Sequence, residues 1–421
     1  MINTGYVIVT ERDTNPYSST YNHTRTRTYE DTTLCPLGWK MYYRIDGNGY
    51  NQGQTVYDYL PCSADGIITQ ANVDSVLYRD YSYDWVLKTA ELGNCVSSIG
   101  DGAFSGRSTS RRLTSIVIPN TVTSIGEYAF DYALGLTSIT IPASVSSIGN
   151  YAFNECSYIT TATISNGVET IGNNAFYACQ RLESITIPNS VTTIGNNAFY
   201  GCYTATSLTI GNSVETIGDS AFYNVKAALG TLTIPDSVTS LGTSAFENCE
   251  KFTALSIGSG ITSIPNRAFY ACKGLTSITI PNNVVSIGNT AFRNCSSATS
   301  ITIGSGVETI AGYAFYNCNS ATSLTLPEGL ETIEERAFES TSRLLTVVIP
   351  STVTSLGNAC FGNCQNRTSI TCLAEIPPTV LSGERPFANT NNCPIYVPAA
   401  SVSAYQTAWT WDASRIQAIP T

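Results

Sequence analysis

The sequence predicts a β-rich repeat solenoid, in which one short unit is wound again and again around a common core. A nonapeptide of the form V-x-x-I-G-x-x-A-F recurs along the chain, and Val191–Phe199 is a clean copy. Its closing phenylalanine stands at positions 104, 130, 153, 176, 199, 222, 246, 269, 292, 315, 338 and 361. A period of 23 residues, kept over more than half of a 421-residue chain, indicates stacked coils that each contact only their neighbours.

The complete unit, legible from Leu113 onward, reads L-x-x-I-x-I-P-x-x-V-x-x-I-G-x-x-A-F-x-x-C and predicts two short strands per coil. In the copy at Ile278–Pro281, isoleucine alternates with threonine, which is the period of a half-buried strand. The proline ends this strand because it has no N–H to donate to a sheet. Val284–Ile287 predicts a second extended stretch, and Gly288 then permits a turn that a side chain would obstruct.

One column of phenylalanines and one of cysteines are expected to point into the core. Ala133 and Val225 replace the cysteine in two coils, so the position is a slot for a small buried hydrophobe. Stacked copies lie roughly 4.8 Å apart, whereas the Cβ atoms of a disulfide lie about 3.8 Å apart, and no paired C-x-x-C indicates a metal site. The expected structural core is Phe130, Phe153, Phe176, Phe199, Phe222, Phe246, Phe269, Phe292, Phe315, Phe338, Phe361, Cys156, Cys179, Cys202, Cys249, Cys272, Cys295 and Cys318. Whether Cys35, Cys62, Cys95 and Cys393 form a disulfide stays open.

Residues 1–85 carry no copy of the repeat and hold 12 of the 25 tyrosines, and we expect a small β-rich domain there. Strands are expected at Val7–Thr10 and at Trp39–Arg44, the latter running into the turn-forming Asp46–Gly49. A short helix is expected within Asn72–Tyr83. The first 30 residues, rich in Thr, Tyr, Ser and Arg, can alternatively form an extended arm.

Residues 86–373 are expected to form the solenoid, beginning with a degenerate coil near Leu87. An insertion before Leu113 brings in three basic residues, Arg107, Arg111 and Arg112. We interpret it as a solvated loop, and the alternative is a contact for an acidic partner or for the N-terminal domain. A one-residue insertion at 226–230 is expected to be a tolerated bulge.

Residues 374–421 are expected to close the array with a degenerate last coil and a capping segment. Phe387 stands for the repeat phenylalanine, and Ile395–Pro398 predicts a last strand. Ser401–Trp409 predicts a short amphipathic helix over the final coil, because an open sheet end must be covered. We interpret Trp409 and Trp411 as residues of this cap rather than as a binding platform.

The unit resembles the leucine-rich repeat of the BspA-like family of bacterial surface proteins, and the resemblance covers roughly residues 87–420. Relative to the general consensus L-x-x-L-x-L-x-x-N-x-L, Ser190, Ser213 and Gly260 replace the ninth-position asparagine. No buried asparagine ladder is therefore expected, and each coil needs another way to satisfy its turn amides. The resemblance implies a leucine-rich repeat solenoid of about 12 coils with opening strands on one face, a role in adhesion or ligand binding, and no enzyme activity.

Two surface stripes are candidate binding faces. The middle outward position of the opening strand is a hydroxyl stripe, which we interpret first as a β-branched ladder that suits a strand and second as an array for a repetitive ligand such as a glycan. The residue after the repeat phenylalanine gives a tyrosine stripe, which either covers an edge of the coils or lies at an interface. The hydroxyl stripe is Thr140, Thr163, Thr186, Thr209, Thr233, Ser256, Thr279, Thr302 and Thr325, and the tyrosine stripe is Tyr177, Tyr200, Tyr223, Tyr270 and Tyr316.

Charge and composition argue against several classes of function. A net charge of −10 and a pI near 4.7 argue against nucleic acid, which needs a clustered basic face. No stretch reaches the ~20 apolar residues of a membrane span, and the N-terminal apolar run is shorter than the ~7 residues of a signal-peptide core. His23 is the only histidine, which excludes His-dependent triads and multi-histidine metal sites in the solenoid. We therefore expect no enzyme, no cofactor and no metal.

The sequence thus favours a non-enzymatic binding scaffold, a cell-surface or secreted adhesin that recognises a protein or glycan ligand through a solenoid face. The alternative is a structural or receptor-binding component of a phage particle or envelope assembly, with the N-terminal region as anchor. A third possibility places recognition in residues 1–85, with the solenoid as a stalk. A virion-associated or intracellular location stays open, because no signal peptide is visible in this chain.

Overall fold

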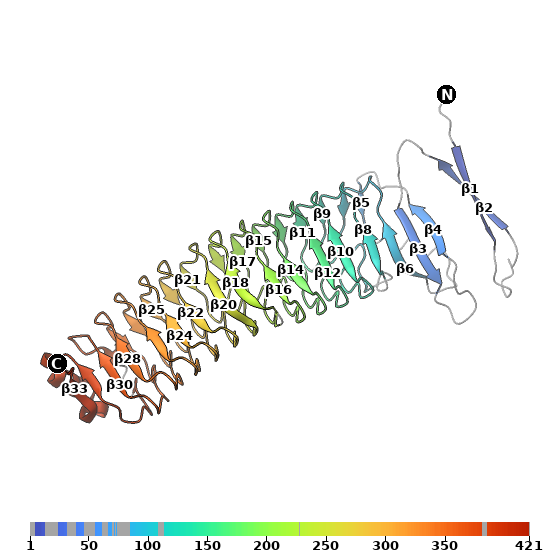
Figure 1. The fold of residues 1–421 in the computed structure, drawn as a ribbon. Coiled ribbons are helices and arrows are strands. Elements are labelled where there is room, and N and C mark those ends of the chain that lie inside the picture. Colours follow the sequence, from blue (N-terminus) through green and yellow to red (C-terminus); the bar gives the residue numbers. More distant parts are fainter. Residues whose placement is uncertain are drawn as a thin grey trace. The chain divides into compact units, whose positions relative to one another are not determined.

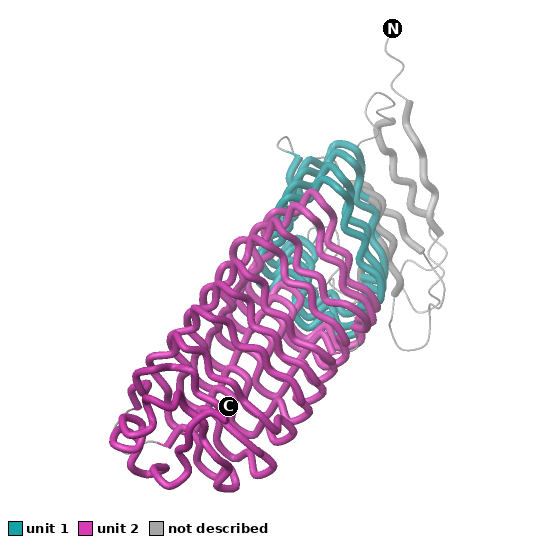
Figure 2. Tube along the Cα trace, turned by 60° about the vertical axis from the view of Figure 1, so that its left-hand side comes forward, with its two compact units in different colours: residues 1–182 teal, residues 183–421 magenta. Residues whose placement is uncertain are grey.

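The computed structural model describes residues 5–12, 24–31, 39–45, 55–60, 66–69, 71, 73, 85–107, 113–226, 228–380 and 385–420. They belong to two compact units, Met1–Leu182 and Glu183–Thr421, which Figure 2 colours separately. Each unit is built of parallel coils in which successive strands lie side by side (Figure 1). The predicted β-solenoid fold is thereby confirmed.

In the first unit, the chain alternates between opening strands, which pair parallel in two separate sheets, and two-residue second strands, which form one parallel ladder. Pairing is in register with the repeat, so that Thr140 lies beside Thr163 and Ile148 beside Ile171. The opening strands are β6 (Trp85–Glu91), β8 (Ser115–Val117), β10 (Ser138–Ile141) and β12 (Thr161–Ile164). The second strands are β5 (Ile67–Ile68), β7 (Ser98–Ile99), β9 (Ser124–Ile125), β11 (Ser147–Ile148) and β13 (Thr170–Ile171).

The second unit continues the same plan, and Thr279, Thr302 and Thr325 pair in one row across three opening strands. The expected bulge is present as a register shift between Gly230 and Thr231. Its opening strands are β14 (Ser184–Thr186), β16 (Ser207–Thr209), β18 (Gly230–Ile234), β20 (Phe252–Ile257), β22 (Ser277–Thr279), β24 (Ser300–Thr302), β26 (Ser323–Thr325), β28 (Thr346–Ile349), β30 (Ser369–Cys372) and β32 (Ile395–Val397). Its second strands are β15 (Thr193–Ile194), β17 (Thr216–Ile217), β19 (Ser240–Leu241), β21 (Ser263–Ile264), β23 (Ser286–Ile287), β25 (Thr309–Ile310), β27 (Thr332–Ile333), β29 (Ser355–Leu356) and β31 (Thr379–Val380).

The core of each unit is a stack of phenylalanine rings. Phe104 to Phe176 stack in the first unit and Phe199 to Phe361 in the second, with neighbouring ring centroids 4.9 to 5.8 Å apart. Every phenylalanine in these columns is at most 1% exposed. Isoleucine, valine and alanine of the same unit surround the rings, so burial of one apolar side chain per position is repeated from coil to coil.

The repeat glycine lies where successive coils approach closely, and Pro265, Ala311 and Glu334 take its place in three coils. A Cβ atom on Gly288 would lie 2.8 Å from the carbonyl oxygen of Ile264 and 2.7 Å from the amide nitrogen of Asn266. Gly288 does not adopt a positive φ, so the turn that we predicted from it does not depend on left-handed backbone. Left-handed residues instead flank the phenylalanine, as at Thr290 (φ 56°) and Asn294 (φ 64°).

Short polar side chains satisfy the backbone where the consensus asparagine is missing. The ninth-position hydroxyls of Ser144 and Ser237 donate to carbonyl oxygens one coil back, at 2.7 Å in each case. At the turn after the repeat glycine, the Asn266 side-chain oxygen accepts from the amide of Asn289 at 2.8 Å. Part-buried and exposed bonds between coils therefore satisfy these backbone groups.

The N-terminal strands extend the first unit's opening-strand sheet. β3 (Trp39–Ile45) pairs antiparallel with both β4 (Thr55–Leu60) and β6, and β6 pairs parallel with β8. The predicted strand at Trp39–Arg44 is confirmed. β1 (Gly5–Arg12) confirms the strand expected at Val7–Thr10, but it pairs antiparallel with β2 (Thr24–Asp31). Because β1 and β2 pair only with each other among the described strands, the alternative of an extended arm over the first 30 residues stays a prediction.

Two other N-terminal features bear on the predicted domain boundary. The turn at Asp46–Gly49 and most of Asn72–Tyr83 lie outside the described residues. β5 already pairs parallel with β7, so the ladder of second strands begins inside the segment assigned to residues 1–85. The division at residue 85 stays a prediction.

A helical segment closes the C-terminal coils, as predicted. It comprises η2 (Ala399–Ser401), α2 (Val402–Ala408) and η3 (Thr410–Arg415). Tyr405 and Trp409 are buried, and the Tyr405 hydroxyl donates to the carbonyl oxygen of Ala374 at 2.8 Å. A further strand that the sequence analysis missed, β33 (Ile416–Ala418), pairs parallel with β32.

Candidate functional site

The hydroxyl stripe lies on the opening strands and points away from the core. All nine of its residues are exposed, whereas their neighbours in the strand, such as Ile278 and Ile301, are buried. Exposed valines occupy the same strand position at Val117 in the first unit, with 59% exposure, and at Val348 in the second unit, with 53% exposure. Within each unit, the face therefore offers hydroxyl and methyl groups repeated at the strand spacing of roughly 4.8 Å.

A neighbouring column of threonines shows the contrast. The hydroxyls of Thr253, Thr276 and Thr299 each donate to a carbonyl oxygen 23 residues earlier, at 3.0 to 3.3 Å. By contrast, the stripe hydroxyls of Thr279 and Thr302 make no hydrogen bond to another described residue. One column stabilises the stack, and the other retains its donors and acceptors for solvent or a ligand.

The tyrosine stripe is only half exposed. The rings of Tyr200 and Tyr223 stack with centroids 4.5 Å apart, and the Tyr223 hydroxyl accepts from the Asn248 amide at 3.1 Å. Tyr270 likewise accepts from Asn294 at 3.3 Å. These contacts favour the interpretation that the tyrosines cover one edge of the coils.

Arginines that the sequence analysis did not single out lie among these tyrosines. The Arg267 guanidinium binds both oxygens of buried Glu247, at 2.6 and 2.8 Å, and lies over the Tyr270 ring. Arg293 has no ion pair among the described residues and lies 4.7 Å from the Tyr316 ring centroid. These arginines and tyrosines have no regular spacing in the sequence. Their contacts across neighbouring coils therefore become visible only in the structure.

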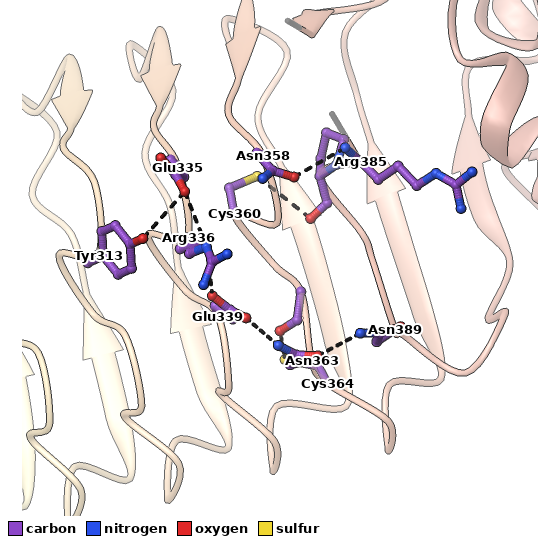
Figure 3. A network of polar contacts seen from close by, with 12 residues as sticks. Tyr313, Glu335, Arg336, Glu339, Asn358, Cys360, Asn363, Cys364, Arg385 and Asn389 are labelled. Carbon is purple, nitrogen blue, oxygen red and sulfur yellow. Dashed lines mark hydrogen bonds and ion pairs between the residues drawn. The ribbon is translucent and has the colours of Figure 1, made fainter. Parts of the chain in front are cut away.

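Figure 3 shows how this edge continues toward the C-terminus as a chain of polar contacts. Glu335 accepts from the Tyr313 hydroxyl at 3.4 Å and ion-pairs with Arg336 at 3.2 Å. Arg336 also ion-pairs with Glu339 at 3.5 Å. In the next coils, the Asn363 amide donates to Glu339, and the Asn389 amide donates to Asn363 at 2.8 Å. Arg336 is thereby shared between two carboxylates, those of Glu335 and Glu339.

The repeat cysteines lie in the core as reduced thiols. Cys272 donates its S–H to the carbonyl oxygen of Phe246, one coil back, at 3.2 Å, and Cys156, Cys179, Cys249, Cys295 and Cys318 make the equivalent bond at 3.0 to 3.4 Å. Burial raises the pKa of Cys272 and of Cys318 to about 12, so neither forms a reactive thiolate at neutral pH.

The structure describes two of the four cysteines for which the sequence left disulfide formation open. Cys393 is a buried reduced thiol, and Cys95 is disulfide-bonded. Cys35 and Cys62 lie outside the described residues.

One arginine of the basic insertion, Arg107, makes contacts within the protein. Arg107 ion-pairs with Asp131, which is 1% exposed, and its guanidinium lies 4.2 Å from the centroid of the Tyr132 ring. The Asn154 amide donates to the same Asp131 carboxylate at 2.7 Å. Arg111 and Arg112 lie outside the described residues, so the proposed contact with a partner stays a prediction for them.

Within the described ranges, no three His, Cys, Asp or Glu side chains gather closely enough to hold a metal ion. Among the helices that the structure describes, none is long and apolar enough to cross a membrane.

Comparison with known proteins gives a repeat family and a matching fold. The family model described as BspA type leucine-rich repeat region matches residues 75–206, 192–310 and 285–402. A leucine-rich repeat protein from Bacteroides ovatus has a similar structure, with a TM-score of 0.57 and 22% identity over 100% of this chain and 99% of that chain.

Two further solved structures are similar at lower TM-scores. A leucine-rich cell surface protein from Faecalibacterium prausnitzii gives a TM-score of 0.44 at 21% identity, over 88% of this chain and 96% of that chain. The pneumococcal vaccine antigen PcpA gives 0.44 at 19% identity, over 77% of this chain and 80% of that chain. Among curated proteins, none matches the sequence.

Proposed function

Because the chain belongs to the BspA-type leucine-rich repeat family, we propose that it is a non-enzymatic binding scaffold that acts as an adhesin. In this proposal a protein or glycan ligand lies along the opening strands and contacts the hydroxyl stripe. The scaffold contributes rigidity, since stripe residues such as Thr186, Thr233 and Thr279 each lie between two buried isoleucine or leucine neighbours in the strand.

One observation carries the choice of face: the stripe hydroxyls are exposed and uncommitted, while those of the adjacent column bond to the backbone. A ligand that replaces water at the stripe therefore breaks no protein hydrogen bond. The repeated spacing suits a ligand that is itself extended and repetitive, such as a glycan chain or a β-strand.

We further propose that the protein is displayed at a cell surface or secreted. Support comes from the disulfide at Cys95, because disulfides persist in oxidising compartments and are rare in the cytosol. The many reduced cysteines do not oppose this, since each described one is buried and hence shielded from oxidants.

Binding of the full chain to a panel of extracellular-matrix proteins and to a glycan array tests the proposal. For any ligand found, Thr209→Lys combined with Thr233→Lys should weaken binding at least tenfold, because two long charged side chains then stand on the face.

The matched control is Thr239→Lys with Thr262→Lys, two exposed threonines on the second-strand side of neighbouring coils in the same unit. It adds the same charge and should leave affinity within twofold. Equal loss in both pairs, or in neither, would contradict recognition through the opening strands.

A further inference from the structure

Two adjoining hollows lie beside the C-terminal closure, away from the hydroxyl stripe in sequence. Their volumes are about 400 and 580 Å³, within the range of small-ligand sites. Both are lined by Asn392, Trp411, Asp412 and Arg415, and the larger also by Asn366 and Arg385. The hollows therefore form one mainly polar groove, in which Trp411 is the large aromatic side chain that lines both parts and buried Phe387 lines the larger part.

Trp411 is held as a rigid platform at this groove. One face of its ring stacks on Trp409, with centroids 5.7 Å apart and planes 18° apart. Trp409 is in turn 1% exposed, donates to the Pro378 carbonyl oxygen at 3.2 Å, and makes an edge contact with Tyr405. Trp411 itself is half-buried and lines the groove, so part of its surface is open and its orientation is fixed before any ligand arrives.

Side-chain amides supply paired donors and acceptors around the platform. Gln365, Asn391 and Asn392 are exposed, and their amide groups bond to no other described residue. Asn366 uses one N–H on the Ser342 carbonyl oxygen at 3.3 Å. Planar amides next to an aromatic face suit a ligand that has adjacent hydroxyl groups and a flat patch of C–H bonds.

Charge in the groove is unbalanced. Arg415 is 9% exposed and bonds to Asp412 at 2.8 Å, to Thr390 at 2.9 Å and to the Cys393 carbonyl oxygen at 2.8 Å, so this pair is neutral. Arg385 is exposed, and its guanidinium has no ion pair or hydrogen bond within the part of the chain that is described. Figure 3 shows this guanidinium pointing away from the polar network. Among the described residues of the groove, Arg385 is therefore a cation without a paired carboxylate, in a protein of net charge −10.

We propose that this groove binds an acidic saccharide, a pyranose ring that carries a carboxylate. The ring lies against Trp411, the amides of Asn391 and Asn392 bond to its hydroxyls, and Arg385 binds the carboxylate through two N–H groups. This site is separate from the hydroxyl stripe, so it adds a second specificity to the binding scaffold and does not depend on recognition by the opening strands.

The test is a titration of the full chain with oligogalacturonate and with the neutral galacto-oligosaccharide of equal length, followed by tryptophan fluorescence and calorimetry. We expect the acidic sugar to bind and to change the tryptophan emission, with the neutral sugar at least tenfold weaker. Arg385→Gln should remove that preference. Arg343→Gln, which removes another exposed arginine of the same unit that does not line the groove, should leave it unchanged.

Trp411→Ala should lower affinity for the acidic sugar at least tenfold, and Trp411→Phe should retain most of it. Because Arg385 is exposed, its variant keeps the fold even if the tryptophan variant loosens the closure. No binding of the acidic sugar at millimolar concentration, equal binding of both sugars, or full affinity in Arg385→Gln would each overturn the proposal. The variant with lysines at Thr209 and Thr233 should bind oligogalacturonate normally, so the two sites can fail separately.

Discussion

Inside the second unit, from Phe199 to Phe361, one type of side chain occupies the same place in every coil, whereas the closing residues depart from the repeat at many positions. The repeated interior is mainly apolar, and each coil packs on the next through similar contacts. The closure contains a buried arginine, Arg367, two stacked tryptophans and the only groove discussed above. The repeated coils thus stabilise the fold, whereas the segment after the last regular coil carries side chains that the repeat does not contain.

The largest expected effect belongs to the interior. Phe292→Ala removes a ring that is 0% exposed and lies 5.0 and 5.3 Å from its two neighbours in the stack. We expect a loss of about 3–5 kcal/mol in the free energy of unfolding, because a cavity opens between two coils that cannot collapse independently. Urea denaturation measures it. A loss below about 1 kcal/mol would show that the stack relaxes around the gap.

The next effect tests the close approach of the coils. In Gly242→Ala the new Cβ would lie 2.4 Å from the Asp219 amide nitrogen, which is backbone and cannot move aside alone. We expect a loss of about 1–3 kcal/mol. Gly312→Ala is the control, because its Cβ would meet first the flexible Asn289 side chain at 3.0 Å. Similar melting temperatures for the two variants would contradict the role assigned to the repeat glycine.

At the closure, a substitution should stabilise the protein. Arg367 is 1% exposed and stands where Leu344 stands one coil earlier, and its Nε and Nη1 atoms bond to no described residue. Arg367→Leu should raise the free energy of unfolding by about 1–2 kcal/mol, since it removes buried polar atoms that lack partners. If thermal unfolding shows a loss instead, the arginine has a function in the folded state that its neighbours do not reveal.

The last expected effect is a pH dependence of the thiol column, which is absent at neutral pH. Burial raises the pKa of Cys272 to about 12 from the ordinary thiol value of 9.0, so the folded state keeps the proton that the unfolded chain releases. The contribution to stability is complete below about pH 9 and is lost as the pH rises toward 12, at on the order of 1 kcal/mol per pH unit for each thiol. Cys272→Ala should therefore be less stable at pH 7 but show a shallower decline between pH 9 and 11. Parallel declines would show that other groups dominate.

The same comparison explains what the sequence could and could not predict. Within the repeat, period alone assigns each residue to core or surface, which is why the strands at Ile278 and Ile287 and the phenylalanine column follow from spacing. The contacts of Arg293 and Glu247 depend on which side chains lie next to each other in neighbouring coils. These residues occupy variable positions, so the repeat consensus does not predict their contacts. The groove at Trp411 was missed because its residues come from separate segments joined only by the closure.

The in-register pairing of Thr279, Thr302 and Thr325 has a consequence for how the gene can change in length. Because each coil presents nearly the same upper and lower surface, a gain or loss of 23 codons within the array leaves matching surfaces on both sides of the change. Unequal recombination between neighbouring copies can therefore alter the length of the gene product while its two ends stay intact. Selection can then change the number of coils in steps of one, and no new contact surface between coils has to evolve.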